Sequence, residues 1–126
     1  MKILLDEHLP KAVAATLGRL LTGTDAQHIA DWQHGRWLAE DDPVLLEGLW
    51  QDRRPLASYD RATLPRHLAE RIADGKDHAG VIFVDQERFP ATRIGDMARA
   101  LAKLLATYPA PSDWINRIVT LTSWPR

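Results

Sequence analysis

Apolar runs without alternation mark four places along the chain where a buried strand is expected. Such runs are typical of strands covered on both faces, as in a parallel sheet. Three of the four end directly on an acid, namely Asp6, Asp60 and Asp85. The expected strands cover residues 3–5, 55–59, 79–84 and 118–121, and a weaker one is expected within residues 25–30.

Four other stretches carry apolar residues at the spacing of an amphipathic helix. Asp42 followed by Pro43 predicts an N-cap with proline at the first helical position. Gly75 closes the third helix and Pro109 ends the fourth. The expected apolar faces are Leu9, Val13, Leu17, Leu20 and Leu21; Val44, Leu45, Leu46, Leu49 and Trp50; Leu64, Leu68 and Ile72; and Ile94, Met97, Ala98, Leu101, Leu104 and Leu105.

Strands that alternate with helices of this length indicate βαβ units and therefore an α/β fold with a mainly parallel sheet. A chain of 126 residues fits one domain, 1–126, and no repeat or linker divides it. The sequence therefore predicts three layers, α/β/α, with helices on both faces of the sheet.

Composition excludes several classes of function. There are 16 Lys and Arg against 17 Asp and Glu, a net charge of −1, so bulk attraction of nucleic acid is not expected. With no Cys, the chain has no disulfide, thiolate metal site or cysteine nucleophile. No apolar run approaches the roughly 20 residues of a membrane span or resembles a signal peptide. We therefore expect no membrane association and a cytoplasmic location.

The acids that follow the expected strands are the main chemical signal. In a parallel sheet the carboxyl ends of the strands share one edge, where ligands bind. Carboxylates gathered there repel one another unless a cation compensates them, and oxygen ligands without Cys favour Mg²⁺ or Mn²⁺. Such an ion can activate water and neutralise a phosphoryl oxygen, as metal-dependent nucleases require.

Each acid taken alone also has an ordinary structural explanation as a turn or cap residue. Because Asp42 is expected to cap a helix, Asp41 is the preferred metal ligand of that pair. Asp6 and Asp60 are the strongest candidates, since each follows an apolar run. Asp85 is the weakest, because polar residues after it suggest a solvated turn.

The segments KILLDEHLP, LAEDDPVLLEG, PLASYDRAT and HAGVIFVD resemble, in order and spacing, the PIN-like proteins grouped as the DUF5615 family. The resemblance covers roughly residues 1–122. It implies a three-layer α/β/α fold related to PIN-domain ribonucleases, some of which are toxins of bacterial toxin–antitoxin pairs. Carried over by position, the catalytic and metal-binding acids are Asp6, Asp41 and Asp60.

The same resemblance implies single-stranded RNA as substrate, Mg²⁺ or Mn²⁺ as cofactor, and an antitoxin or other regulatory protein as partner; a homodimer is a further expectation. The sequence departs from the family pattern at Ala62, where many relatives carry a second Asp. Asp85 is a candidate substitute ligand. The departure leaves a catalytically inactive PIN-like interaction module as an alternative.

Several other residues have two interpretations. Arg54, Arg61 and Arg66 are candidates to hold RNA phosphates, or they belong to a solvated helix face. Ser58 either orients a ligand or bonds to backbone in a buried strand. Trp32 and Trp37 either stack on bases, anchor their loop to the core, or form an oligomer contact. Trp50 fits a helix's apolar face and is expected in the core.

The favoured hypothesis is therefore a metal-dependent ribonuclease. A receiver-like phosphoacceptor domain is the alternative, because that class also places acids after its first and third strands and needs Mg²⁺. It further needs a Lys after its last strand, where this chain has Thr122, Ser123 and Trp124.

Overall fold

In the computed structural model, which describes residues 1–122, five parallel strands form one sheet in the order β2-β1-β3-β4-β5. The strands are β1 (Lys2–Leu5), β2 (Asp25–His28), β3 (Leu56–Ser58), β4 (Val81–Val84) and β5 (Ile118–Leu121). The helices are α1 (Lys11–Leu20), α2 (Asp42–Asp52), α3 (Leu64–Ala73) and α4 (Ile94–Thr107), with short 3-10 helices η1 (Trp32–Gly35) and η2 (Pro111–Trp114). The predicted α/β class is confirmed, and residues 25–28 do form a strand.

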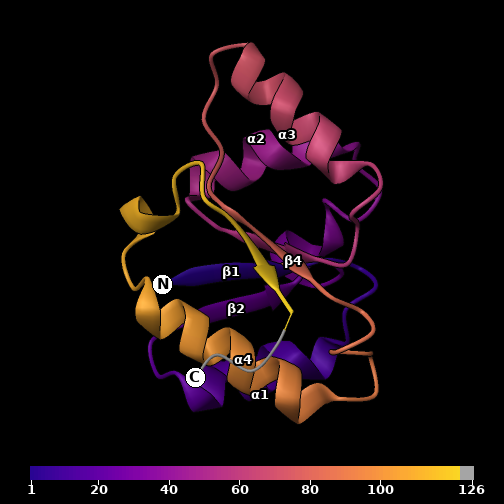
Figure 1. The fold of residues 1–126 in the computed structure, drawn as a ribbon, viewed down its shortest axis with the longest axis vertical. Helices are drawn as coiled ribbons and strands as arrows, with labels where there is room; N and C mark the ends of the chain where they lie inside the picture. The colour runs from indigo at the N-terminus through magenta and orange to yellow at the C-terminus, as the bar shows by residue number, and fades with distance from the viewer. Residues whose placement is uncertain (123–126) are drawn as a thin grey trace.

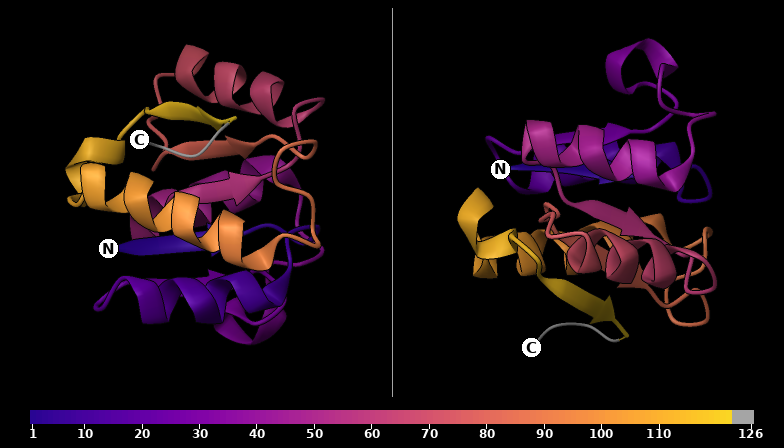
Figure 2. Two further views of the ribbon diagram at one scale, coloured as in Figure 1. Left: turned by 60° about the horizontal axis from the view of Figure 1, so that its bottom comes forward. Right: turned by 90° about the horizontal axis from the view of Figure 1, so that it is seen from above.

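Helices cover both faces of the sheet, so the molecule has the three layers expected (Figure 1). One face of the sheet packs on α1 and α4, and the other packs on α2 and α3. Alternate strand residues therefore belong to different cores: Leu5 lies in the first core and Leu4 in the second. Seen from above in the right view of Figure 2, α2 and α3 lie over the sheet on the viewer's side.

The crossovers do not all have the same hand. From β2 to β3 and from β3 to β4, the chain moves toward β5 by way of α2 and α3, on one face. From β4 to β5 it moves in the same direction by way of α4, which lies on the opposite face. About 98% of such crossovers are right-handed. The crossover from β4 through α4 to β5 therefore has the rare left hand.

This placement of α4 leaves part of β5 uncovered by the described residues. Leu121 faces α4 and is buried, whereas Ile118, which pairs with Val81 on the other face, is 53% exposed. No helix within residues 1–122 is long and apolar enough to cross a membrane.

Candidate functional site

Asp6, Asp60 and Asp85 lie at the carboxyl edge of the sheet, as the parallel arrangement predicted. Asp6 follows β1 directly, and its N–H donates to the Ala57 carbonyl at 3.0 Å. Asp85 follows β4, and its N–H donates to the Leu121 carbonyl, also at 3.0 Å. Asp60 comes two residues after the end of β3.

A buried serine connects the first and third of the predicted acids. The Ser58 hydroxyl donates to Asp6 Oδ2 at 2.7 Å and accepts a hydrogen bond from the Asp60 N–H at 3.0 Å. Ser58 is 1% exposed, so little water competes for these bonds. The other oxygen of Asp6 accepts from the Glu7 N–H at 2.9 Å. Segments far apart in the sequence are thus joined at one point.

The Asp60 carboxylate is held by the turn that leads into α3. Its Oδ1 accepts from the N–H groups of Ala62 and Thr63, both at 2.9 Å, and its Oδ2 accepts from the Thr63 hydroxyl. Burial raises the pKa of Asp60, but these hydrogen bonds outweigh it and hold the pKa below its ordinary value. Asp60 is therefore ionised at neutral pH, and one of its supporting donors is the backbone of Ala62.

The start of α2 places Asp41, the predicted ligand, and its neighbour Asp42 in different surroundings. Asp41 occupies the N-cap position with extended backbone, and its side chain is exposed and makes no capping bond. Asp42 is the first residue of α2, Pro43 is the second, and the Asp42 side chain lines the same pocket as Asp6 and Asp60. The helix begins one residue earlier than predicted, because proline is tolerated throughout the first turn.

Asp42 experiences the negative charge of its neighbours. Burial raises the pKa of its carboxyl, the charges of Asp6 and Asp60 raise it further, and His67 acts in the opposite direction. The His67 Nε2 lies 3.9 Å from Asp42 Oδ2, and its Nδ1 lies 3.6 Å from Glu70 Oε2. Within residues 1–122, Nδ1 is a buried atom without a hydrogen-bond partner.

The pocket at this edge has a volume of about 560 Å³, and most of its lining residues are either acidic or aliphatic. The acidic residues are Asp6, Glu7, Glu40, Asp42 and Asp60, the aliphatic ones are Ile29, Leu38 and Leu45, and the remainder are His8, Tyr59 and Gln86. Tyr59 has its hydroxyl occupied, since it donates to the Phe89 carbonyl at 2.6 Å.

Among residues 1–122, no group of three or more His, Asp or Glu side chains is gathered closely enough to hold a metal ion. The donor chemistry nevertheless fits Mg²⁺ or Mn²⁺, because three carboxylates from three separate elements line one pocket. None of the ion pairs within that range joins a Lys or Arg to Asp6, Asp42 or Asp60. A cation would relieve the repulsion that raises the pKa of Asp42.

Asp85 reaches the same edge but is engaged elsewhere. Its Oδ2 accepts from the Arg88 guanidinium at 2.8 Å, and its Oδ1 accepts from the Glu87 N–H at 3.0 Å. These bonds hold the pKa of Asp85 below its ordinary value, and the charge of Arg61 contributes to the same effect. Asp85 does not line the acidic pocket, although the next residue, Gln86, does.

The structure corrects the prediction that Arg54 holds an RNA phosphate. Arg54 is 3% exposed and lies at the amino edge of the sheet, away from the acids. Its guanidinium donates to Asp25 Oδ2 at 2.7 Å, to Asp52 Oδ2 at 2.8 Å and to the Ile3 carbonyl at 3.1 Å. Arg61 and Arg66 are exposed, as predicted for such contacts, and Arg66 lies 3.6 Å from Glu70.

Trp32 and Trp37 anchor their loop to the core. Both are buried, their rings are stacked with centroids 5.5 Å apart, and Trp37 Nε1 donates to Gln33 Oε1 at 2.9 Å. The Trp37 ring lies against Gly48 of α2. Neither ring is free to stack on a base, so that interpretation is wrong in this structure. Trp50, expected in the core, is only half-buried, and the Arg53 guanidinium stacks on it.

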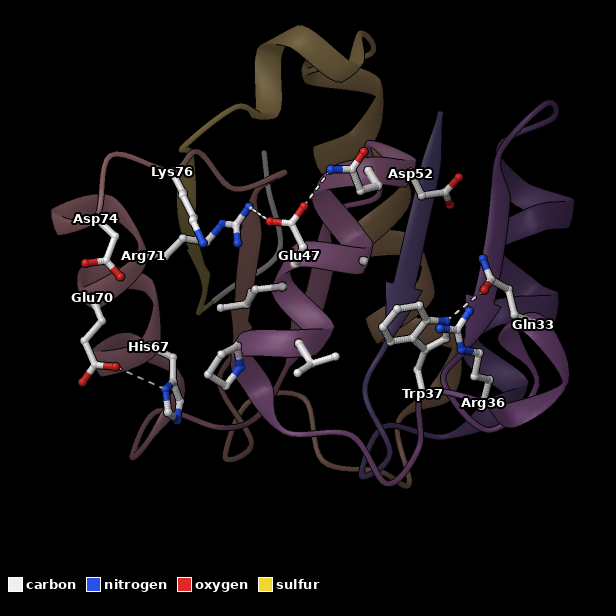
Figure 3. Close-up of a pocket in the computed structure, with 15 residues that line it drawn as sticks. Gln33, Arg36, Trp37, Glu47, Asp52, His67, Glu70, Arg71, Asp74 and Lys76 are labelled. Atoms are coloured by element: carbon white, nitrogen blue, oxygen red, sulfur yellow. Dashed lines mark hydrogen bonds and ion pairs between the residues drawn. The ribbon is translucent and has the colours of Figure 1, made fainter.

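A larger cavity of about 720 Å³ lies over α2, between α3 and the loop that carries Trp37 (Figure 3). None of the predicted acids lines it. Part of its charge is paired: Glu47 accepts from Arg71 at 3.0 Å, and also from Gln51 at 2.7 Å. His67, whose Nε2 lies 3.9 Å from Asp42 Oδ2, also lines this cavity.

Comparisons of the chain with protein-family models, curated proteins and solved structures found no match. The resemblance to PIN-like proteins consequently stays a prediction.

Proposed function

We propose that the protein is a metal-dependent ribonuclease of the PIN-like type. The observation that supports this proposal best is the contrast between the two edges of the sheet. At the amino edge, Asp25 and Asp52 each pair with a cation at 2.7 or 2.8 Å. At the carboxyl edge, Asp6, Asp42 and Asp60 line one pocket without a Lys or Arg ion pair among the described residues. A site of uncompensated carboxylates is suited to a divalent cation.

Asp6, Asp42 and Asp60 would hold the ion, with Asp42 in the place that the sequence assigned to Asp41. A bound Mg²⁺ or Mn²⁺ supplies charge for a phosphoryl oxygen and lowers the pKa of a water. The chain itself keeps the carboxylates in position: Ser58 restrains Asp6, and Thr63 restrains Asp60. Arg61, which is exposed and whose charge lowers the pKa of Asp85, would contact a phosphate of single-stranded RNA.

Asp41 and Asp42, which are adjacent at the start of α2, provide a matched test of this assignment. Mn²⁺ titrations by calorimetry are expected to show binding by the wild type and by Asp41→Asn. Asp42→Asn should weaken Mn²⁺ binding by more than about tenfold, since removing a ligand costs at least as much as removing its supporting partner. In Mn²⁺, Asp41→Asn should cleave a labelled single-stranded RNA like the wild type, and Asp42→Asn should cleave it more slowly. Equal binding by the two variants would contradict the placement of Asp42.

A receiver-like phosphoacceptor remains the second candidate because its strand order, 2-1-3-4-5, is the order of this sheet. The β4–α4–β5 crossover has the opposite hand to the other crossovers of this sheet. This difference disfavours a receiver domain, whose crossovers are expected to have the same hand. The residue after β5 is Thr122 and not the required Lys, and Ser123 and Trp124 lie outside the described residues. Incubation with acetyl phosphate separates the two: a stable modification at Asp60 would favour the receiver.

A catalytically inactive PIN-like module is distinguished by activity. It would bind a partner such as an antitoxin, or a second copy, without cleaving RNA. Mn²⁺ binding that depends on Asp42, without cleavage of any single-stranded RNA tested, would favour this module over the ribonuclease.

A further inference from the structure

Three aliphatic residues that line the acidic pocket, Ile29, Leu38 and Leu45, have no part in holding a cation. Ile29 and Leu45 are 3% and 4% exposed and belong to the hydrophobic core on the α2 and α3 side of the sheet. Leu38 is 43% exposed although it lines the same pocket. An exposed leucine beside carboxylates is unfavourable in water, so a ligand that covers it gains the burial of that surface.

Leu38 is held in place by its neighbours in the chain. Its N–H donates to the Gly35 carbonyl at 3.2 Å. The adjacent Trp37 is buried, stacked on Trp32 and in contact with Gly48 of α2. The side chain is therefore presented to the pocket by an anchored loop, and its position does not have to be ordered when a ligand binds.

We infer that Leu38, backed by Ile29 and Leu45, forms a base-binding wall, against which the base of one RNA nucleotide lies while its phosphate lies near the carboxylates of the same pocket. This inference rests on the proposed ribonuclease function. A volume of about 560 Å³ is within the range of pockets that hold small ligands. A nucleotide matches such a lining, because it combines a flat apolar face with a phosphate whose charge a divalent cation held by the carboxylates would neutralise.

Polar groups at the same pocket suit the edge of a base. Glu40 supplies acceptors and Gln86 supplies both donors and acceptors, and both line the pocket. The two tryptophans expected to stack on bases are buried, so the base-binding wall takes over that role with aliphatic contacts.

The test compares Leu38→Ser with Leu20→Ser. Leu20 is a matched control, because it is 48% exposed and does not line the pocket. Fluorescence anisotropy with a labelled hexaadenylate in Mn²⁺ should show about tenfold weaker binding by Leu38→Ser, the loss expected from the uncovered part of one leucine. Leu20→Ser and the apolar variant Leu38→Met should bind like the wild type.

A hexamer of abasic ribose phosphate provides the control on the ligand. The wild type should bind this hexamer more weakly than hexaadenylate. Leu38→Ser should bind it with the same affinity as the wild type. Binding of hexaadenylate that Leu38→Ser leaves unchanged, or equal binding of the two hexamers by the wild type, would overturn the base-binding wall.

Calorimetry with Mn²⁺ on the same proteins separates this result from the proposed function. If Leu38→Ser binds Mn²⁺ like the wild type but binds hexaadenylate more weakly, the base-binding wall is supported. If the wild type binds no Mn²⁺ but its RNA binding depends on Leu38, the wall stands and the metal-dependent ribonuclease fails.

Discussion

Ser58 has a role that its position in the sequence left open. A hydroxyl in a buried strand was expected either to orient a ligand or to bond to backbone. In the structure it bonds to the Asp6 carboxylate at 2.7 Å and to the Asp60 backbone at 3.0 Å. One side chain therefore ties together the two strand-end acids, and its loss would leave polar atoms near the core without partners.

Ser58→Ala is expected to lower the free energy of unfolding by about 1–3 kcal/mol, the cost of leaving buried polar groups unpaired. Ser112→Ala is the control, because Ser112 is exposed and should change stability by less than about 0.5 kcal/mol. Urea denaturation at pH 7 measures both. Equal midpoints for the two variants would show that the Ser58 bonds contribute nothing to stability.

The two adjacent acids at the start of α2 show the limit of residue-level inference. Asp41 and Asp42 have the same chemistry, and either one can precede a proline in the first turn of a helix. Which of them faces the pocket depends on where the helix begins, and the structure begins it at Asp42. No local signal in the sequence distinguishes these alternatives.

At the scale of elements, the loop between β2 and α2 is fastened by a contact between a tryptophan and a glycine. A Cβ added at Gly48 would lie 2.5 Å from the tip of the Trp37 ring. The ring cannot easily yield, because it is stacked on Trp32 and hydrogen-bonded to Gln33. Glycine inside a helix is normally unfavourable, so its presence here reflects this close approach.

Gly48→Ala should therefore lower the free energy of unfolding by about 1–2 kcal/mol, because overpacking outweighs the gain in helix propensity. Gly18→Ala in α1 is the matched control: its Cβ would meet only the Thr24 carbonyl oxygen, at 4.0 Å. That variant should gain about 0.5–1 kcal/mol. Guanidinium denaturation of both variants checks the difference in sign, and stabilisation by Gly48→Ala would show that the Trp37 loop yields easily.

At the scale of the whole molecule, the amino edge of the sheet is locked by a buried cation. Arg54 bonds to Asp25, Asp52 and the Ile3 carbonyl, and thereby joins β1, β2 and the segment that follows α2. Burial raises the pKa of both aspartates, but the hydrogen bonds from Arg54 and Gln27 to Asp25, and from Lys2 and Arg54 to Asp52, outweigh it, so both pKa values lie below the ordinary 3.8. Their pairing contributes stability above about pH 4, and the contribution is lost as the pH falls below that value.

Arg54→Met should lower the free energy of unfolding at pH 7 by about 3 kcal/mol, because it leaves two acids without their buried partner. The difference from the wild type should narrow between pH 5 and pH 3 as the aspartates become protonated. Arg53→Met is the control, since Arg53 is exposed. Urea denaturation across this pH range measures the difference, and a constant difference would contradict the assigned pairing.

Hydrophobic periodicity was enough to predict the layers of the fold and the edge at which Asp6, Asp60 and Asp85 lie. Both depend on local patterns: continuous apolar runs for buried strands, and three- and four-residue spacing for helices. Parallel strands then place their carboxyl ends together, whatever the remaining details. Arg61 and Arg66 could likewise be expected at the surface from their polar surroundings.

Tertiary packing alone decided which side chains are buried at the amino edge and in the loop before α2, because their burial depends on contacts between distant segments. The burial of Arg54 follows from Asp25, which is remote from it in sequence, and the burial of Trp37 follows from Gly48. The placement of α4 on the face of α1 sets the unusual hand of the last crossover. Local patterns carry no information on such pairings, since the energy of each arises only when both partners have been brought together.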